Sequence, residues 1–476
     1  MKVTNNTRGW MVALLVLGAC TAAVPEPQPE PQPRPLDLLA LYEPVDRDPR
    51  PEVLSVELRA VRAHVRLDDT LEPELWTYDG RVPGPLLRVP KGGTIEVDLD
   101  NALDEPTTIH WHGMRVPNEQ DGVALATIPA LLPGQRRHYT LPAKDAGLFW
   151  YHPHVRSAAQ LGFGLYGAIW VVDPDEARIA DDDVVLVLSD LGLTESGVLD
   201  SPSSGGDLAT LFGREGNVVL VNGRVHPVLE ARVGRRQRWR LVNAARSRYF
   251  WLELPGQRWW KIGEDGGLAD RVTEIERVLL IPGERVDLVV EPQREGEVPL
   301  RWVPYDRGFG STEFRDPEDI LRYRVAAGDV APTGEPPALP GTPPPRVTTQ
   351  TSTRASLRLT QSSRGEPFSL GINGVPADRA PPVHAHIGDT FELEIDNQMD
   401  WDHPFHVHGF FFEAIDAAGV PQSPRVLKDT INVPRREKRR VRILFDERPG
   451  MWMFHCHILD HADAGMMSMF MLSEPH

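Results

Sequence analysis

The sequence GGTIEVDLDN at residues 92–101 recurs twice in this chain, as GRRQRWRLVN at residues 234–243 and as GDTFELEIDN at residues 388–397. In each copy a Gly lies nine residues before an Asn, and apolar residues alternate with polar ones between them. Because successive side chains of a strand point to opposite faces, this alternation is typical of a strand with one buried face. The recurrence therefore predicts one β unit that is used three times.

A short turn from a Gly to a Pro precedes each copy, and the three turns lie at residues 80–83, 223–227 and 374–376. Gly and Pro are the residues that most often separate strands. Together the turns and strands predict an all-β chain of three similar β-sandwich domains. We expect these domains at residues 52–175, 181–325 and 350–476, with a Pro-rich linker at residues 326–349 between the last two.

The composition restricts the classes of function. The chain has 476 residues, which is too long for one domain and suggests about three. Its formal net charge of −17 argues against nucleic-acid binding, since phosphate recognition needs a basic face. We expect the negative charge to serve solubility first and the attraction of cations second. The sequence leaves the oligomeric state open.

The first 20 residues are typical of a secretory signal, with Lys2 and Arg8 ahead of a short apolar run. The run ends in LGAC at residues 17–20, which resembles the cleavage site of bacterial lipoproteins, and a Pro-rich tether follows at residues 21–51. We therefore expect an exported protein of the cell envelope or periplasm that contacts a membrane only through a lipid on Cys20. An ordinary signal with an incidental Cys is the alternative.

One segment near the C-terminus, His455-Cys456-His457, carries metal-ligand residues on both faces of a predicted strand. In an extended chain its two imidazoles point to one side and its thiol to the other. With Cys456, the nearby His461 and Met466 could complete a soft metal site, and a Cys and His set with a weak axial Met is typical of an electron-transfer copper. The peptide would then connect that copper to whatever His455 and His457 bind.

Ten of the 16 histidines lie in four short clusters, which suggests metal chelation more strongly than any single His-x-His pair would. Residue parity sorts the clusters into two sites and places His403 on the Cys456 side. The other side collects eight imidazoles: His110, His112, His152, His154, His406, His408, His455 and His457. Eight neutral nitrogens suit several borderline metal ions, and copper binds such ligands tightly.

A further pair, His384 and His386, has no partner cluster, so we expect it to lie on a surface strand. The same expectation applies to four isolated histidines: His64, His138, His226 and His476.

The four clusters resemble the copper-binding motifs of the multicopper oxidases, the laccase-like family, and the resemblance spans the whole mature chain. It implies three consecutive cupredoxin-like Greek-key β-sandwich domains. It also implies four copper ions, of which one is type 1, one is type 2 and two are type 3. The middle domain offers only His226, like the family's copper-free domain, so the trinuclear site is expected between the first and third domains.

Carried over residue by residue, the resemblance implies a ligand set for each ion. The type 1 copper would bind His403, Cys456 and His461, with Met466 as its axial ligand. The type 2 copper would bind His110 and His406. One type 3 copper would bind His112, His152 and His457, and the other would bind His154, His408 and His455.

The resemblance further implies a reaction. A reductant gives single electrons to the type 1 copper, with His461 as the residue of electron entry, and O2 accepts four electrons and four protons to become two waters. Asp121 and Asp460 match acidic positions that the family uses near the trinuclear site. A nearby acid is useful because reduced oxygen species become basic. The alternative is that each Asp only orients a ligand histidine.

Three functions share these motifs. The first is a laccase-like oxidase of phenols and aromatic amines, and the second is a metallo-oxidase of Cu(I) or Fe(II) in metal homeostasis. Copper-efflux members of the family carry a Met-rich insert, and the absence of a Met-rich loop from this sequence favours the first function. The third is a copper-free scaffold of the same fold, which the intact ligand set argues against.

Overall fold

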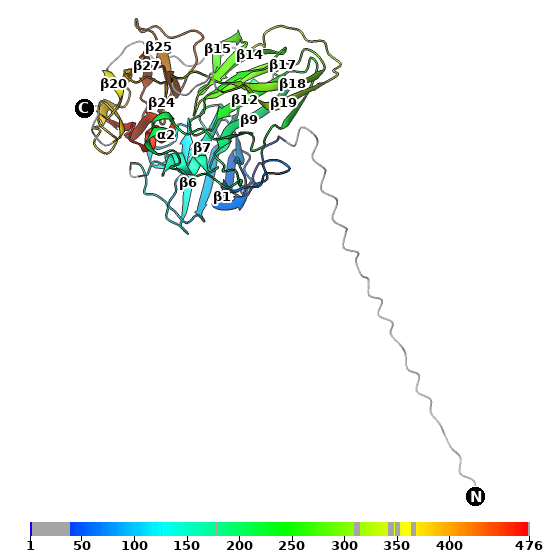
Figure 1. Cartoon of the computed structure of the whole chain (residues 1–476), viewed down its shortest axis with the longest axis horizontal. Coiled ribbons are helices and arrows are strands. Elements are labelled where there is room, and N and C mark those ends of the chain that lie inside the picture. Colours follow the sequence, from blue (N-terminus) through cyan, green and yellow to red (C-terminus); the bar gives the residue numbers. More distant parts are fainter. Residues whose placement is uncertain are drawn as a thin grey trace.

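Figure 1 shows a computed structural model of the chain. It describes Met1 and residues 39–124, 126–177, 179–308, 315–340, 347, 353–362 and 368–474. The predicted signal, Cys20, most of the tether, part of the linker and His476 lie outside these residues. Within them, no helix has the length and apolar character needed to cross a membrane.

The described chain is built almost entirely of strands, which confirms the all-β prediction. The first domain contains β1 (Val53–His64), β2 (Glu74–Tyr78), β3 (Gly84–Pro90), β4 (Thr94–Asn101), β5 (His110–His112), β6 (Arg136–Pro142), β7 (Gly147–His152) and β8 (Gly167–Val172). The middle domain contains β9 (Asp182–Leu191), β10 (Val218–Val221), β11 (Val228–Arg232), β12 (Gln237–Asn243), β13 (Phe250–Glu253), β14 (Arg258–Glu264), β15 (Gly267–Glu274), β16 (Arg277–Leu280), β17 (Arg285–Glu291), β18 (Gly296–Val303) and β19 (Glu318–Ala326).

The third domain contains β20 (Thr353–Gln361), β21 (Leu370–Ile372), β22 (Val383–His386), β23 (Thr390–Asn397), β24 (His403–Val407), β25 (Phe412–Ile415), β26 (Thr430–Val433), β27 (Lys438–Leu444), β28 (Gly450–Cys456) and β29 (Met467–Ser473). The helices of the described chain are short: α1 (Ser157–Gly162), α2 (Gly206–Phe212), α3 (Leu459–Asp463) and the 3-10 turns Asn118–Gln120 and Pro174–Glu176. The exact domain boundaries stay predictions.

The three repeated segments occupy equivalent places in three sheets. Strand β4 lies between a parallel neighbour, β1, and an antiparallel neighbour, β6. Strand β12 lies in the same way between β9 and β17, and β23 lies between β20 and β27. Each sheet faces a second sheet that contains one parallel pair, namely β3 with β8, β11 with β19, and β22 with β29. The repeat found in the sequence is therefore also a repeat of the structure.

The Asn that closes each repeat has the same buried role in all three domains. Asn101, Asn243 and Asn397 each accept a hydrogen bond from the backbone N–H two residues later, at 2.9 to 3.1 Å. Each side-chain amide also donates to a backbone carbonyl of the following loop and to a distant strand or loop, where Asn101 and Asn243 meet one carbonyl and Asn397 meets two. A buried backbone group needs such a partner, so one Asn shapes the loop that leaves the strand.

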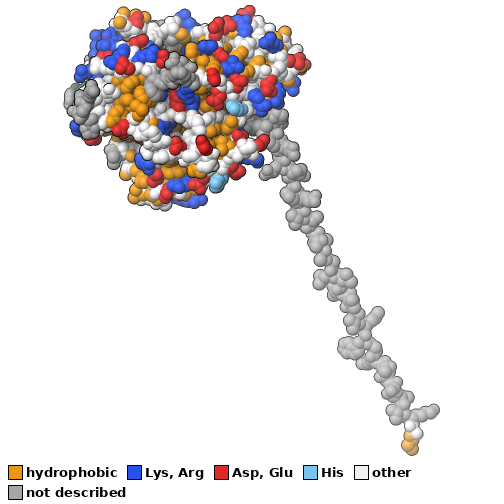
Figure 2. All heavy atoms as spheres, viewed as in Figure 1, with side chains coloured by type: hydrophobic (Ala, Val, Ile, Leu, Met, Phe, Trp, Pro, Cys, Tyr) orange, Lys and Arg blue, Asp and Glu red, His pale blue; other side chains and the backbone are white. Residues whose placement is uncertain are grey.

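Each pair of sheets encloses its own apolar core. In the third domain, Leu393 and Val441 from one sheet share a buried cluster with Phe405, Phe454 and Phe470 from the other. Figure 1 shows the three domains arranged around a common centre, with the first domain in blue and cyan, the middle in green and the third in yellow to red. Lys and Arg side chains are interspersed with Asp and Glu over the face drawn in Figure 2.

Candidate metal centre

Strand β28 lies at the centre of its sheet, between β24 and β29, and it ends in His455 and Cys456, with His457 directly after it. In the antiparallel pairing with β24, His455 lies opposite His406 and Cys456 lies opposite Phe405. All three residues of the His-Cys-His segment are fully buried. The alternation expected from the sequence therefore puts the thiol and the two imidazoles on opposite faces of one strand.

On the Cys456 side, three ligand atoms form a compact triangle. The Sγ of Cys456 lies 3.4 Å from His403 Nδ1 and 3.5 Å from His461 Nδ1, and the two nitrogens lie 3.2 Å apart. Met466 is also buried, and its carbonyl accepts the backbone N–H of Cys456 at 3.1 Å. One Cys, two His and a neighbouring Met are the ligand set of an electron-transfer copper.

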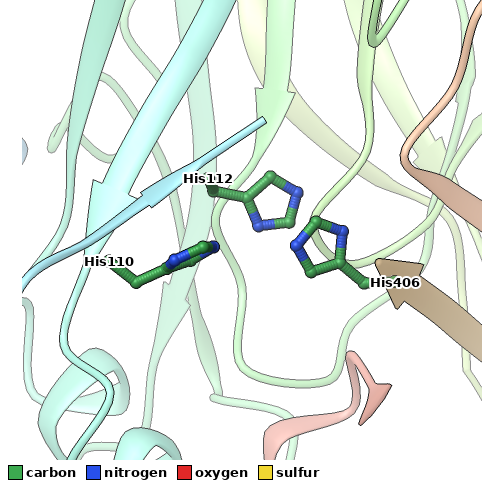
Figure 3. A group of neighbouring side chains, drawn as sticks. All are labelled: His110, His112 and His406. Carbon is green, nitrogen blue, oxygen red and sulfur yellow. The ribbon is translucent and has the colours of Figure 1, made fainter. Parts of the chain in front are cut away.

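On the opposite face, β5, β7, β24 and the residues that follow them add six imidazoles to His455 and His457, so that eight lie together between the first and third domains. Figure 3 shows three of these rings pointing toward one another, His110 and His112 from β5 and His406 from β24. The ligand atoms gather in three groups with separations within 4.8 Å: His110 with His112 and His406, His112 with His152 and His457, and His154 with His408 and His455. The last two groups are the two type 3 sets that the resemblance implies.

Hydrogen bonds to the outer nitrogens fix the orientation of these rings. His110 Nδ1 donates to the Asp121 carbonyl at 2.9 Å, and His152 Nδ1 donates to the Pro153 carbonyl at 3.0 Å. His406 Nδ1 donates to the Asp429 carbonyl at 2.9 Å. A proton held on one ring nitrogen leaves the lone pair of the other free for a metal.

The inward nitrogens fit copper because they are buried and unpartnered. Among the described residues, these ring nitrogens make no hydrogen bond: His110 Nε2, His112 Nδ1, His152 Nε2, His154 Nε2, His406 Nε2 and both nitrogens of His457. Burial lowers the pKa of His154 to about 3 and holds the pKa of His152 and His457 well below the ordinary value, so these rings are neutral at pH 7. Neutral imidazoles that lack a protein partner are ready metal ligands.

The thiol of Cys456 is held in a different state. Burial raises the pKa of this thiol far above its ordinary value. Without a metal, the group is therefore a neutral S–H, because only a bound cation would favour the thiolate at this depth.

Asp121 lies at the trinuclear side, where the sequence analysis expected an acid. Its Oδ2 accepts a hydrogen bond from His408 Nδ1 at 2.9 Å, and its Oδ1 lies 3.3 Å from His110 Nδ1. Burial alone would raise the pKa of Asp121, but the two ring N–H groups beside it lower the pKa well below the ordinary value. The carboxylate therefore contacts two ligand histidines at once.

Asp460 lies elsewhere, at the contact between α3 and the middle domain. Its carboxylate pairs with the guanidinium groups of Arg214 and Arg246 and accepts a hydrogen bond from Ser247 at 3.2 Å. Within the described chain, no hydrogen bond joins it to an imidazole of the trinuclear side. A role of Asp460 as a proton carrier stays a prediction, and its contacts favour a role in holding α3 and His461 against the middle domain.

Two residues at the site were missed by the sequence analysis. Asp429 lies 3.2 Å from His112 Nε2, and Arg285 pairs with its carboxylate. Arg285 belongs to the middle domain, which was expected to hold no copper. No motif or spacing could have identified this pair, because the two residues are 144 positions apart and neither lies beside a histidine in the sequence.

The pair that was expected on the surface lies on β22, at the edge of its sheet. His384 is exposed, and His386 Nδ1 lies 3.2 Å from the Glu474 carbonyl. The pair therefore lies on an edge strand at the surface, as the sequence predicts.

Comparison with known proteins supports the assignment of these histidines and Cys456 to a copper centre. Sequence profiles described as "Multicopper oxidase" match residues 60–176 and 342–476. The chain is 32% identical to "Multicopper oxidase MmcO" of Mycobacterium tuberculosis, over 82% of this chain and 81% of that protein. It is 28% identical to "Laccase" of Bacillus subtilis, over 84% of this chain and 91% of that protein.

A solved structure described as "Multicopper oxidase from Campylobacter jejuni: a metallo-oxidase" has the same fold. Its TM-score to this chain is 0.79 at 28% identity, over 91% of this chain and 94% of that one. The identity and coverage of the Mycobacterium relative, together with the copper-ligand geometry, settle the family. The chain belongs to the multicopper oxidase family, and it is a copper-dependent oxidoreductase that uses O2.

Proposed function

We propose that the enzyme couples one-electron oxidation of a reductant at a type 1 copper to four-electron reduction of O2 to water at a trinuclear copper cluster. The observation that carries this proposal is the two-faced strand β28. Its Cys456 belongs to the triangle with His403 and His461, and its neighbours His455 and His457 belong to the eight-imidazole site. A short covalent path therefore joins the two sites, which would hold one type 1, one type 2 and two type 3 ions.

The copper ions would supply the redox chemistry by alternating between Cu(I) and Cu(II). The protein fixes the ligands and controls protons. Asp121 keeps His408 in place through Oδ2, while its Oδ1 makes no hydrogen bond among the described residues. The site keeps Asp121 as a carboxylate, so a proton that it accepts at Oδ1 would be passed on readily, and its bond to His408 would be kept throughout, as proton delivery to O2 requires.

The class of reductant depends on access to the type 1 site. His461 is fully buried, and its Nε2 donates to the Leu211 carbonyl of α2 at 3.0 Å. The next residue, Phe212, packs its ring against Trp401 beside His403. A phenol that must contact the His461 ring would first have to displace α2. Because α2 covers His461, a reductant must deliver its electron across α2. This arrangement favours Cu(I) or Fe(II) over the phenols and aromatic amines of a laccase.

The relatives include both kinds of enzyme, one named a laccase and one described as a metallo-oxidase. The net charge of −17 adds a long-range attraction for metal cations. We therefore propose a metallo-oxidase of Cu(I) or Fe(II) as the first candidate and a laccase-like oxidase as the second.

The test is O2 consumption by the copper-loaded full-length enzyme with a phenol, an aromatic amine, Cu(I) and Fe(II) in turn. We expect kcat/KM to be higher for a metal ion than for either organic reductant. Higher kcat/KM for the phenol would reject the metallo-oxidase proposal and leave the coupled oxidase intact. A protein that stays colourless after copper loading and consumes no O2 would instead support the copper-free scaffold.

We also propose that the enzyme is exported to the cell envelope and anchored by a lipid on Cys20. The support is the LGAC sequence at residues 17–20 after a short apolar run. Labelling of the expressing cells with radioactive palmitate should mark the wild-type protein and leave Cys20→Ala unmarked. Equal absence of label from both would reject the anchor.

A further inference from the structure

We propose that Arg285 of the copper-free middle domain is a positioning residue for the trinuclear site. It would hold Asp429 against His406, a ligand of the type 2 copper, and against His112, a ligand of one type 3 copper. This inference rests on the proposed trinuclear site. It gives the middle domain a part in building that site, beyond the separation of two copper-binding domains.

Asp429 touches two ligand histidines from two different domains. Its Oδ1 accepts a hydrogen bond from His112 Nε2 at 3.2 Å and lies 3.5 Å from His406 Nδ1. The Asp429 carbonyl accepts the Nδ1–H of His406 at 2.9 Å. These contacts occupy the outer nitrogens and leave His112 Nδ1 and His406 Nε2 facing the metal site, unpartnered.

The hydroxyl of Thr430 completes this support. It donates to Asp429 Oδ1 at 2.8 Å and lies 3.2 Å from His406 Nδ1. Asp429 therefore sets the direction of two rings, that of His112 through its carboxylate and that of His406 mainly through its carbonyl, and such outer partners tune metal affinity strongly.

Arg285 binds the carboxylate of Asp429 through a bidentate contact. Its Nη1 donates to Asp429 Oδ1 at 2.7 Å, and its Nη2 donates to Asp429 Oδ2 at 2.5 Å. Both side chains are buried, so the pair is shielded from solvent and ions. A planar guanidinium fixes the plane of a carboxylate, which the point charge of a Lys cannot do.

Arg285 is itself fixed by groups from the first and middle domains. Its Nε donates to the Leu148 carbonyl of β7 at 3.1 Å, and its Nη2 donates to the Asp265 carbonyl at 3.1 Å. A side chain at Gly113, which follows His112, would place its Cβ only 2.3 Å from Arg285 Nη2. Arg285 thus connects all three domains at one point behind His112 and His406.

The middle domain also binds the backbone and side chains of residues 428–430, the segment that contains Asp429. Asp265 accepts the N–H groups of Asp429 at 3.2 Å and Thr430 at 3.1 Å. Lys428, just before them, pairs with Glu264 at 2.6 Å and Glu284 at 2.7 Å. Segment 428–430 is therefore held by charged groups of the middle domain, and breaking a buried pair there leaves an uncompensated charge.

The experiment compares three variants of the copper-loaded full-length enzyme. Arg285→Lys keeps the positive charge but cannot make the two parallel hydrogen bonds to Asp429. Asp429→Asn keeps the shape of the side chain but removes its negative charge. Arg238→Lys is the matched control, since Arg238 forms an equally buried pair with Asp287 inside the middle domain and contacts no ligand histidine within the described chain. The readouts are the type 2 signal in electron paramagnetic resonance, copper release to a chelator, and the visible absorbance of the type 1 site.

We expect Arg285→Lys and Asp429→Asn to alter the type 2 signal and to weaken type 2 copper binding by roughly 10- to 100-fold, with the type 1 absorbance retained. Arg238→Lys should leave both spectra unchanged, even if it lowers the unfolding temperature. A wild-type type 2 signal and release rate in Arg285→Lys overturn the inference, and if that variant does not fold, the same result in Asp429→Asn overturns it. If the wild-type enzyme itself shows neither spectrum, the proposed function fails instead.

Discussion

Gly283 allows the middle domain to approach the trinuclear site, and its replacement by Ala is a sharp test of that packing. Its φ of +87° is a left-handed conformation that side chains rarely adopt. A Cβ at this position would lie 2.8 Å from His457 Cδ2, 2.9 Å from His457 Cγ and 3.1 Å from His457 Nδ1. His457 is fully buried, so its ring cannot move aside freely.

Two effects lower the free energy of unfolding in Gly283→Ala. The left-handed backbone costs a non-Gly residue about 1–2 kcal/mol. Overpacking against the His457 ring adds about 1–3 kcal/mol. We therefore expect the free energy of unfolding to fall by about 2–5 kcal/mol, a large part of the roughly 5–15 kcal/mol typical of a folded domain.

Gly134→Ala is the matched control. Gly134 has a similar φ of +77°, but a Cβ there would meet nothing within 4 Å, so only the backbone cost applies. Urea unfolding of the metal-free proteins should place the midpoint of Gly283→Ala below that of Gly134→Ala. Copper loading should then reveal weaker binding of the type 3 ion assigned to His457 in Gly283→Ala alone. Equal midpoints for the two variants would falsify the close packing of Gly283 on His457.

Four other outcomes are expected. Cys456→Ser should remove the visible absorbance of the type 1 copper and abolish turnover while trinuclear copper remains, and retained absorbance would reject Cys456 as a ligand. Asp121→Asn should slow O2 reduction with copper content intact, and normal turnover would remove its proposed role. Burial lowers the pKa of both His154 and His461 to about 3, so the unfolded chain takes up protons at these residues below their ordinary pKa of 6.5 while the folded chain does not. Stability of the metal-free protein should therefore fall as the pH drops from 6.5 toward 3, by up to about 1.4 kcal/mol per pH unit for each residue, and a flat urea midpoint over this range would contradict the neutral buried state. Asn243→Ala leaves three buried backbone groups without partners and should cost about 3–9 kcal/mol at roughly 1–3 kcal/mol per group, whereas exposed Gln398→Ala should leave the urea midpoint unchanged.

The fold could be predicted from sequence because its signals are local. The alternation over residues 92–101 reflects a strand with one buried face, and Asn101 closes that strand through hydrogen bonds to nearby backbone. The metal site could be predicted for the same reason, since parity along His455-Cys456-His457 fixes which face each ligand occupies.

The residues that support the site could not be predicted in this way. Arg285 and Asp429 meet only after three domains have packed together, and neither residue type nor spacing marks them beforehand. Asp460 matches an acidic position that the family uses near the trinuclear site, and its carboxylate pairs with Arg214 and Arg246, contacts between distant segments that the sequence did not indicate. The cover that α2 provides over His461 likewise depends on contacts between distant segments.

The protonated state of the Cys456 thiol bears on how long the newly folded protein can wait for its metal. A neutral thiol is a poor nucleophile and resists oxidation, and full burial denies it both oxidants and disulfide partners. Folding therefore stores the most reactive ligand of the enzyme in an inert form, as the proposed export from the reducing cytoplasm would require. Arrival of copper then switches this chemistry on, so synthesis and metal supply need not coincide in time.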